Sequence, residues 1–172
     1  MDVFLEKIVK KRATAVDIAI NLLLVVAAII LFLVIAVFAT AYLGALGIFI
    51  GFAELYGAWY LLSSRSLEYE YSLTNGELDV DCIIAQRKRK KLASLNCREF
   101  EIIAPVNNEH KREIEAPGIK NKIFAVSHPQ SEGQYFGIFN DTEKGRTLLV
   151  FEPDERMIES FKTYIPRKVM DK

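Results

Sequence analysis

The chain has 172 residues, which suits one ordinary domain, and its 22 basic and 22 acidic side chains cancel to a formal charge of zero. A composition that is 51% hydrophobic and 26% charged excludes a disordered or collagen-like chain, and two cysteines are too few for a disulfide-rich secreted scaffold. The zero net charge also argues against a dedicated nucleic-acid-binding protein, which normally carries a strong basic excess.

The average composition hides two chemically different segments. Residues 18–62 contain 38 apolar residues out of 45 and a single charge, Glu54, whereas residues 63–172 contain 18 basic and 18 acidic residues. We therefore expect three parts: a basic flank over residues 1–17, a membrane segment over residues 18–62 and a water-exposed domain over residues 63–172. The expected fold class is an α-helical membrane hairpin joined to a mainly-β (α+β) domain.

The first twelve residues fit a short amphipathic helix that lies on a membrane surface. Its apolar face would hold Phe4, Leu5, Ile8 and Val9. A flexible basic flank explains the same composition, and the sequence leaves both interpretations open.

The stretch of 36 uncharged residues from 18 to 53 is too long for one membrane span. As a single helix it would measure ~54 Å, against a hydrocarbon core of ~30 Å. We therefore expect two spans, near residues 18–39 and 43–62, with a turn around Thr40, Tyr42 and Gly44. A signal peptide is excluded because its apolar region is shorter and ends at a cleavage site.

Basic residues flank the two spans, and the turn between the spans has none. They are Lys7, Lys10, Lys11 and Arg12 before the first span and Arg65 after the second. The positive-inside rule then predicts a multi-pass protein of the cytoplasmic membrane with both termini in the cytoplasm.

Small residues in the second span mark a surface for close helix packing. Gly47 and Gly51 form a G-x-x-x-G pair, and Gly57 continues the small-residue pattern with Ala53. Packing against the first span of the same chain is the favoured interpretation, and formation of a homo-oligomer is the alternative.

Glu54 is the one ionisable residue within the spans. A carboxylate within a span raises the free energy of membrane insertion by on the order of 2–3 kcal/mol. A residue kept in spite of this cost is a candidate functional residue. Glu54 is off-centre, so pairing with Asn21 of the first span, protonation or contact with the interface would each give it a structural role. A structural role is favoured over a proton or ion relay, because a relay needs several polar partners.

The domain begins with a β-hairpin. Apolar and polar residues alternate over residues 67–74 and 77–84, and Asn75-Gly76 between them is the strongest short hairpin signal. Five further strands are expected, near residues 90–95, 98–103, 122–127, 134–140 and 146–151.

A helix closes the domain. Pro153, Asp154 and Glu155 suit its first turn, and Pro166 ends it. Seven strands followed by one amphipathic helix resemble the pleckstrin-homology (PH) superfold, a seven-stranded antiparallel barrel whose two near-orthogonal sheets are covered at one open end by the C-terminal helix.

The whole chain also resembles an uncharacterised family of small bacterial membrane proteins that combine two transmembrane helices with a PH-like cytoplasmic domain. The residues that carry the resemblance are Tyr69-Glu70-Tyr71, Thr74-Asn75-Gly76-Glu77-Leu78-Asp79, Arg87-Lys88-Arg89-Lys90 and Cys97-Arg98-Glu99-Phe100-Glu101. The resemblance implies an architecture and carries no catalytic residue.

Five consecutive basic residues, Arg87, Lys88, Arg89, Lys90 and Lys91, follow the predicted hairpin. Near an anionic leaflet each contributes about 1 kcal/mol of attraction, so contact with acidic phospholipid is one interpretation. A charged edge strand that prevents aggregation is the other. In a strand, alternation would place Lys88 and Lys90 on the face opposite to the remaining three. The resemblance to PH domains implies that selective headgroup recognition would use basic residues around the first hairpin loop. Here that loop is Asn75-Gly76-Glu77, which lacks basic residues, so selective recognition is disfavoured.

Catalytic and metal-binding motifs are absent from the sequence. Cys82 and Cys97 lack C-x-x-C spacing, and His110 and His128 are interpreted as surface histidines without a cysteine partner. Phosphate-loop, nucleophile-elbow and H-E-x-x-H motifs are missing. We expect no metal, no cofactor and no enzymatic activity.

The sequence therefore predicts a noncatalytic, membrane-anchored interaction or scaffold module. Its partners would be the lipid bilayer, anionic phospholipid and a protein that the sequence does not identify, with no nucleic acid. The alternative is an oligomeric subunit of a membrane transport or sensing assembly that uses Glu54. A membrane-bound enzyme would need a clustered polar pocket in the water-exposed domain.

Overall fold

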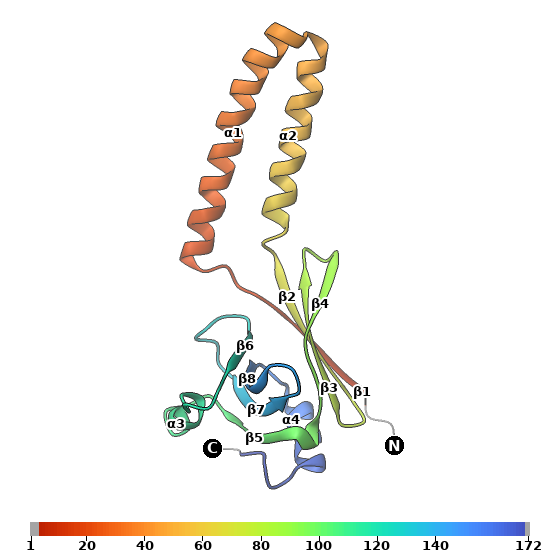
Figure 1. Cartoon of the computed structure of the whole chain (residues 1–172), viewed down its shortest axis with the longest axis vertical. Helices are drawn as coiled ribbons and strands as arrows, with labels where there is room; N and C mark the ends of the chain where they lie inside the picture. The colour runs from red at the N-terminus through yellow and green to blue at the C-terminus, as the bar shows by residue number, and fades with distance from the viewer. Residues whose placement is uncertain (1–3, 171–172) are drawn as a thin grey trace. The chain divides into compact units, whose positions relative to one another are not determined.

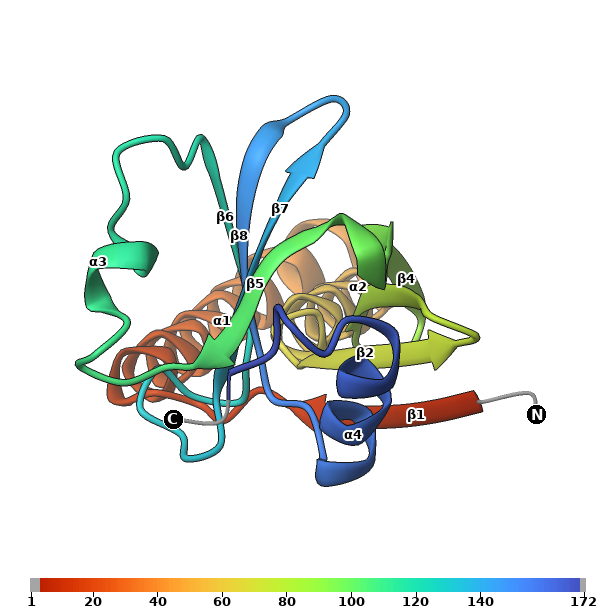
Figure 2. The same cartoon turned by 90° about the horizontal axis from the view of Figure 1, so that it is seen from below.

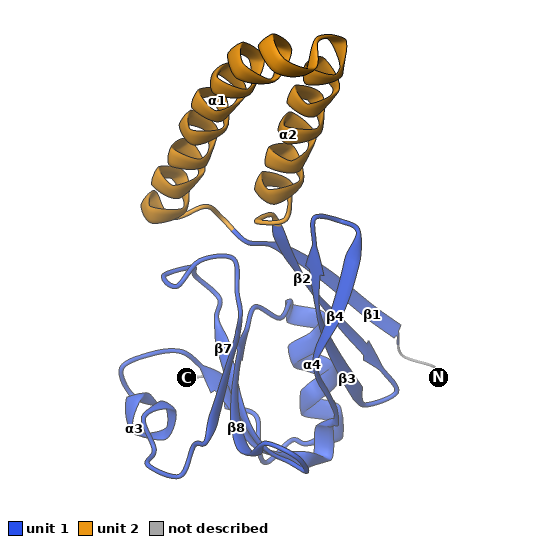
Figure 3. Cartoon of the chain, turned by 45° about the horizontal axis from the view of Figure 1, so that its top comes forward, with its two compact units in different colours: residues 1–11, 67–172 blue, residues 12–66 orange. Residues whose placement is uncertain are grey.

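The computed structural model describes residues 4–170, which divide into two compact units (Figures 1 and 3). One unit contains Met1–Lys11 and Leu67–Lys172, and the other contains Arg12–Ser66. We call them the PH-like unit and the helical hairpin. This division differs from the expected one, because residues 4–11 belong with the C-terminal part of the chain. Residues 1–3 and 171–172 lie outside the description.

Neither interpretation of the N-terminal residues, an amphipathic helix or a flexible flank, holds for residues 4–10, because Phe4–Lys10 forms strand β1. This strand pairs antiparallel with β2 (Leu67–Thr74), from Phe4 opposite Thr74 to Lys10 opposite Glu68. Val9 is buried against the core, whereas Phe4 and Ile8 are exposed. The partner that makes a strand favourable lies more than fifty residues away along the chain, so a local hydrophobic pattern cannot show it.

Over residues 4–170, eight strands form two four-stranded sheets, in place of the expected seven strands. The first sheet has the order β1-β2-β3-β4, with β3 at Glu77–Ile84 and β4 at Lys88–Asn96, and is antiparallel throughout. The second has the order β5-β7-β8-β6. Its strands are β5 (Phe100–Pro105), β6 (Asn121–Ala125), β7 (Tyr135–Asp141) and β8 (Gly145–Phe151).

The second sheet, whose strands β5, β6, β7 and β8 are labelled in Figure 2, is mixed. Strand β6 runs parallel to β8, while the other pairs are antiparallel. No strand pairing among residues 4–170 joins the two sheets into a closed barrel. The expected fully antiparallel barrel is therefore corrected to two open sheets. Short helices at Cys97–Glu99 (η1) and Lys111–Ile114 (α3) interrupt the connections.

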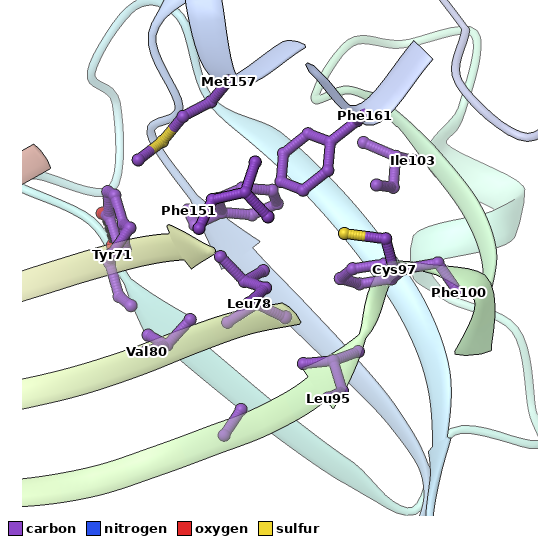
Figure 4. Close-up of a cluster of buried hydrophobic side chains, with 14 of the residues drawn as sticks. Tyr71, Leu78, Val80, Leu95, Cys97, Phe100, Ile103, Phe151, Met157 and Phe161 are labelled. Atoms are coloured by element: carbon purple, nitrogen blue, oxygen red, sulfur yellow. Dashed lines mark hydrogen bonds between the residues drawn. The ribbon is translucent and has the colours of Figure 1, made fainter. Parts of the chain in front are cut away.

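Helix α4 (Glu155–Tyr164) packs against side chains of both sheets and confirms the expected C-terminal helix. Asp154 caps it by accepting a hydrogen bond from the Met157 N–H at 2.8 Å. The ring of Phe161 makes edge-to-face contacts with Phe151 of β8 and Phe100 of β5, at centroid distances of 6.1 and 6.3 Å (Figure 4). Such aromatic pairs contribute about 0.5–1.5 kcal/mol each beyond the area that they bury.

Two tight turns connect the strands of the first sheet. Asn75 and Gly76 have positive φ angles of 50° and 87°, as expected for the predicted hairpin. Ala85 and Gln86, between β3 and β4, also have positive φ angles, of 52° and 55°. The Arg87 N–H donates to the Ile84 carbonyl oxygen at 3.0 Å, which closes a two-residue turn. Residues with a Cβ atom are disfavoured in this region, so the second turn is strained.

The helical hairpin consists of α1 (Ala15–Leu43) and α2 (Ala45–Ser63), joined at Gly44 with a φ of 56°. Both helices are long and apolar enough to cross a membrane. Thr14 and Asp17 form a capping box that starts α1. Helix α1 extends beyond the expected first span at both ends, whereas α2 begins two residues later and ends one residue later than the expected second span. The turn is limited to Gly44.

The helical hairpin can be removed without breaking the sheet. The Lys11 N–H donates to the Leu67 carbonyl oxygen at 2.9 Å, so replacing residues 12–66 with Asn-Gly would join β1 and β2 through a standard two-residue turn. We expect this chain to fold as a soluble monomer with cooperative urea unfolding. A matched chain lacking residues 1–66 should be less stable by about 2 kcal/mol or more, since it loses β1 and the burial of Val9. Equal stability of the two chains would contradict the role given to β1.

The strained second turn predicts a stabilising substitution. Replacing Ala85-Gln86 with Asn-Gly should raise the free energy of unfolding of the joined chain by about 1 kcal/mol, because asparagine and glycine tolerate positive φ. Urea denaturation monitored by circular dichroism measures the change. As a control, Ala85→Gly alone should give part of the gain, and a loss of stability in both variants would exclude strain at this turn.

Candidate functional site

Cross-strand register in the first sheet sorts the basic residues onto two faces. Residues opposite each other on paired strands point to the same face, and successive residues along a strand point to opposite faces. One row contains Val9, Tyr69, Cys82 and Lys90, and the next row on that face contains Lys11, Leu67, Ile84 and Lys88. Neither row contains an acidic residue. We call Lys11, Lys88 and Lys90 the lysine face.

The thiol of Cys82 lies between the cations of the lysine face. Burial raises the pKa of Cys82, and the positive charges of Lys90 and Lys11 partly oppose that shift. Two lysines from opposite edges of the sheet therefore act on the same thiol. Cys82 and Cys97 are both free and buried, and burial raises the pKa of Cys97 to about 12. Neither thiol is activated for chemistry.

On the opposite face of the sheet, two cations of β4 are paired with carboxylates. Arg89 Nη2 lies 2.7 Å from Glu70 Oε2, and Lys91 Nζ lies 2.9 Å from Asp79 Oδ1. Hydrogen bonds from Ser94 and Lys91 hold the pKa of Asp79 below its usual value. The alternation expected for the basic run is thus observed, and it leaves Lys88 and Lys90 on a face without carboxylates in their rows.

The other basic residues predicted to contact lipid occupy different positions. Lys7 is half-buried opposite Tyr71, Lys10 lies opposite Glu68, and Arg12 lies beyond the end of β1. Arg87 follows the strained turn and lines an open pocket of about 340 Å³. Lys88 and Arg89 line that pocket as well, together with Glu68, whose carboxylate accepts a hydrogen bond from the Gln86 side chain at 3.2 Å. The carboxylate makes the pocket itself poorly suited to an anionic headgroup.

Within the helical hairpin, the G-x-x-x-G pair faces the first helix of the same chain. A Cβ atom on Gly47 would lie 2.5 Å from backbone atoms of Ala39 and Thr40, and one on Gly51 would lie 3.1 Å from the Phe32 ring. These glycines therefore allow close packing of α1 and α2 near the Gly44 turn. This arrangement is the one favoured from the sequence.

An ion pair joins the helices at the other end of the hairpin. Arg65 Nη2 lies 3.0 Å from Asp17 Oδ1, and Arg65 Nε donates to Asn21 Oδ1 at 2.7 Å. Arg65 was expected only as an orienting charge, and Asp17 was not singled out at all. The T-x-x-D capping box at residues 14–17 was the sequence signal that could have shown where α1 begins.

Glu54 lines a cavity of about 300 Å³ between α1 and α2. The remaining lining residues are Leu24, Ala27, Ala28, Leu31, Gly57, Ala58 and Leu61. Glu54 Oε2 is buried and has no hydrogen-bond partner, and nothing lies within 4 Å of a Cβ atom built on Gly57. Pairing with Asn21 was one of three structural roles considered for Glu54; the Asn21 amide oxygen accepts a hydrogen bond from Arg65 instead, and Glu54 Oε2 receives none.

A polar cluster in the PH-like unit brings a serine, a histidine and a carboxylate into one region. The Ser127 N–H and hydroxyl both donate to Glu152 Oε1 at 2.9 Å, and the Ser131 hydroxyl also contacts that oxygen. The His128 ring accepts from the Gln130 N–H instead of contacting either serine. The carboxylate therefore fixes the loop after β6, and the imidazole is not placed to act as a base on a serine.

The histidines are more buried than expected. His110 is only 9% exposed, with its ring 5.9 Å from that of Phe136, and His128 is half-buried. The interpretation of His110 as a surface residue is therefore wrong. Among residues 4–170, no group of three or more histidine, cysteine, aspartate or glutamate side chains is arranged to hold a metal ion.

The glycine contacts predict opposite outcomes for two equivalent substitutions. Gly47→Ala should lower the apparent melting temperature of the full chain in detergent by several degrees, because the added methyl group would overlap the α1 backbone. Gly57→Ala is the matched control and should be tolerated, since its methyl group enters open space. A thermal unfolding measurement that gives equal losses for both would contradict the packing described here.

Comparison with known proteins places this architecture in a family. No curated protein and no solved structure matches the chain. A family model described as "Bacterial PH-like domain (DUF6106)" matches residues 1–171, which include β1, the helical hairpin and both sheets. The match confirms the resemblance drawn from the sequence, and the chain belongs to the bacterial PH-like domain family DUF6106.

Proposed function

We propose that this protein is a noncatalytic module whose helical hairpin spans the cytoplasmic membrane and whose PH-like unit contacts anionic lipid and presents its remaining surface to a protein partner. Membership of a PH-like family supports a binding module. The observation that carries the lipid contact is the exposed pair Lys88 and Lys90 of the lysine face, whose cross-strand rows contain no acidic residue.

The pairing of β1 with β2 supports the proposed topology. Residues 4–10 precede α1 and residues 67–74 follow α2, yet the two strands form a continuous ladder. If the hairpin spans a membrane, both strands must lie on the same side, which requires an even number of crossings. The two apolar helices satisfy this condition. The basic residues at both ends of the hairpin then favour the cytoplasmic side.

Short connections support the proximity of the lysine face to lipid. Three residues, 12–14, separate Lys11 from α1, and three residues, 64–66, separate α2 from Leu67. Each connection reaches ~14 Å at most when extended. Lys11 itself is the last residue before one connection, and the Lys88 row is in register with it. The attraction of each lysine near an anionic leaflet is about 1 kcal/mol, which together is enough to bias the orientation of the unit.

Hydrogen exchange of the full chain in nanodiscs tests the proposal. In discs containing phosphatidylglycerol, the peptide that covers the β3–β4 hairpin should exchange severalfold more slowly than in purely zwitterionic discs. Added salt should reverse the difference, because it screens exposed charges beyond roughly 10 Å at 0.1 M. Replacing Lys11, Lys88 and Lys90 together with glutamine should abolish the dependence on anionic lipid.

A matched variant controls for net charge. Replacing Lys120, Lys122 and Lys144 with glutamine removes an equal number of positive charges from other positions of the PH-like unit. This variant should keep the dependence on anionic lipid. If both triple variants lose the effect equally, attraction is set by total charge and the lysine face has no special role. Crosslinking in native membranes, followed by identification of the attached protein, addresses the partner separately.

A further inference from the structure

The cavity around Glu54 lies between two regions of the helical hairpin in which the chain segments contact each other. At one end, Gly47 and Gly51 allow α2 to pack closely on α1. At the other end, Arg65, which follows α2, contacts Asp17 and Asn21 of α1. The small residues between these points leave about 300 Å³ unfilled. The opening is therefore a consequence of residue size within a hairpin that is anchored at both ends.

One carboxylate faces this otherwise apolar space. Glu54 is the sole polar side chain among the lining residues, and its Oε2 atom is buried without a hydrogen-bond partner. Leaving a buried acceptor unsatisfied costs about 1–3 kcal/mol, and more for a charged group. An occupant that brings a positive charge or a hydrogen-bond donor would remove this cost, whereas an aliphatic chain would leave it in place.

We propose that the cavity binds a small lipophilic organic monocation, with its ammonium group beside Glu54 and its apolar part against leucines of both helices. A metal ion is disfavoured, because the lining offers one carboxylate and hard cations need about six or more oxygen ligands. A second copy of the hairpin cannot supply the charge at this depth, since residues 18–53 contain no charged side chain. The basic residue that follows α2, Arg65, is engaged by Asp17 and Asn21.

The energetic case depends on the low polarity of the site. Transfer of an organic cation from water is costly, but its apolar substituents contribute about 25 cal/mol for each Å² that they bury. The carboxylate oxygen is already removed from solvent in the structure, so its desolvation adds no further cost on binding. An anion would be repelled by Glu54, and a neutral molecule of the same shape would gain the apolar contacts alone.

Titration of the full chain in zwitterionic nanodiscs tests the proposal with two probes of equal shape. Phenyltrimethylammonium carries the charge, and tert-butylbenzene is its neutral counterpart. Equilibrium dialysis should show saturable binding of the cation to the wild-type chain. Glu54→Gln should weaken that binding at least tenfold, and Gly57→Leu should abolish it by filling the open space beside Gly57.

Matched controls separate a loss of the site from a loss of charge or fold. Glu143→Gln removes one carboxylate from an exposed turn of the PH-like unit and should leave cation binding unchanged. Circular dichroism and size-exclusion chromatography check that the cavity variants keep their helices and remain monodisperse. The control variant and the folded Glu54→Gln variant together keep the outcome interpretable even if Gly57→Leu does not fold.

Three results would overturn the proposal: no saturable binding of the cation to the wild-type chain, unchanged binding to the Glu54→Gln variant, or equal affinity for the neutral probe. The inference rests on the proposed embedding of the hairpin in lipid, which stable retention in nanodiscs after an alkaline carbonate wash checks independently. A failure of the lysine face to respond to anionic lipid would leave the cavity proposal standing.

Discussion

The architecture depends on the antiparallel pairing of β1 with β2 across an insertion of 55 residues, from Arg12 to Ser66. The helical hairpin occupies the position of a turn between two adjacent strands. Lys11 and Leu67 are hydrogen-bonded neighbours, so the chain leaves and re-enters the sheet at one point. The strand order, the two short connections and the alignment of Lys11 with the β4 lysines all follow from this single pairing.

Alternation along a strand commonly separates apolar from polar side chains onto two faces, and in the first sheet it also separates paired from unpaired charges. The PH-like unit carries many acidic and basic side chains, and their charges cancel when they are counted from the composition alone. Successive residues point to opposite faces, so Arg89 and Lys91 reach carboxylates while Lys88 and Lys90 do not share a row with any. A neutral unit thereby acquires a face of one sign through register alone.

Sequence patterns identified the elements whose signals are local. Asn75-Gly76 predicted the first turn, and the helical spacing after Pro153 predicted α4. The missed features depend on distant partners or unusual conformations: β1 needs β2, and Ala85-Gln86 gives no sign of positive φ. The candidate sites likewise include features that the sequence shows and features that only the packing of the helices reveals. The sequence singled out Glu54, but the cavity beside it and the engagement of Asn21 by Arg65 arise from packing of the two helices.

The insertion within the β1–β2 pair also has a consequence for biosynthesis. β1 leaves the ribosome first but cannot pair until β2 has been made, after both apolar helices. A chain whose helices entered the membrane in the wrong number of crossings would hold the two strands on opposite sides of the bilayer. The edge of β2 and the core around Val9 would then stay open to solvent, in a form that proteases and chaperones recognise. If the hairpin is embedded in a membrane as proposed, the first sheet can therefore form only when the two helices make an even number of crossings.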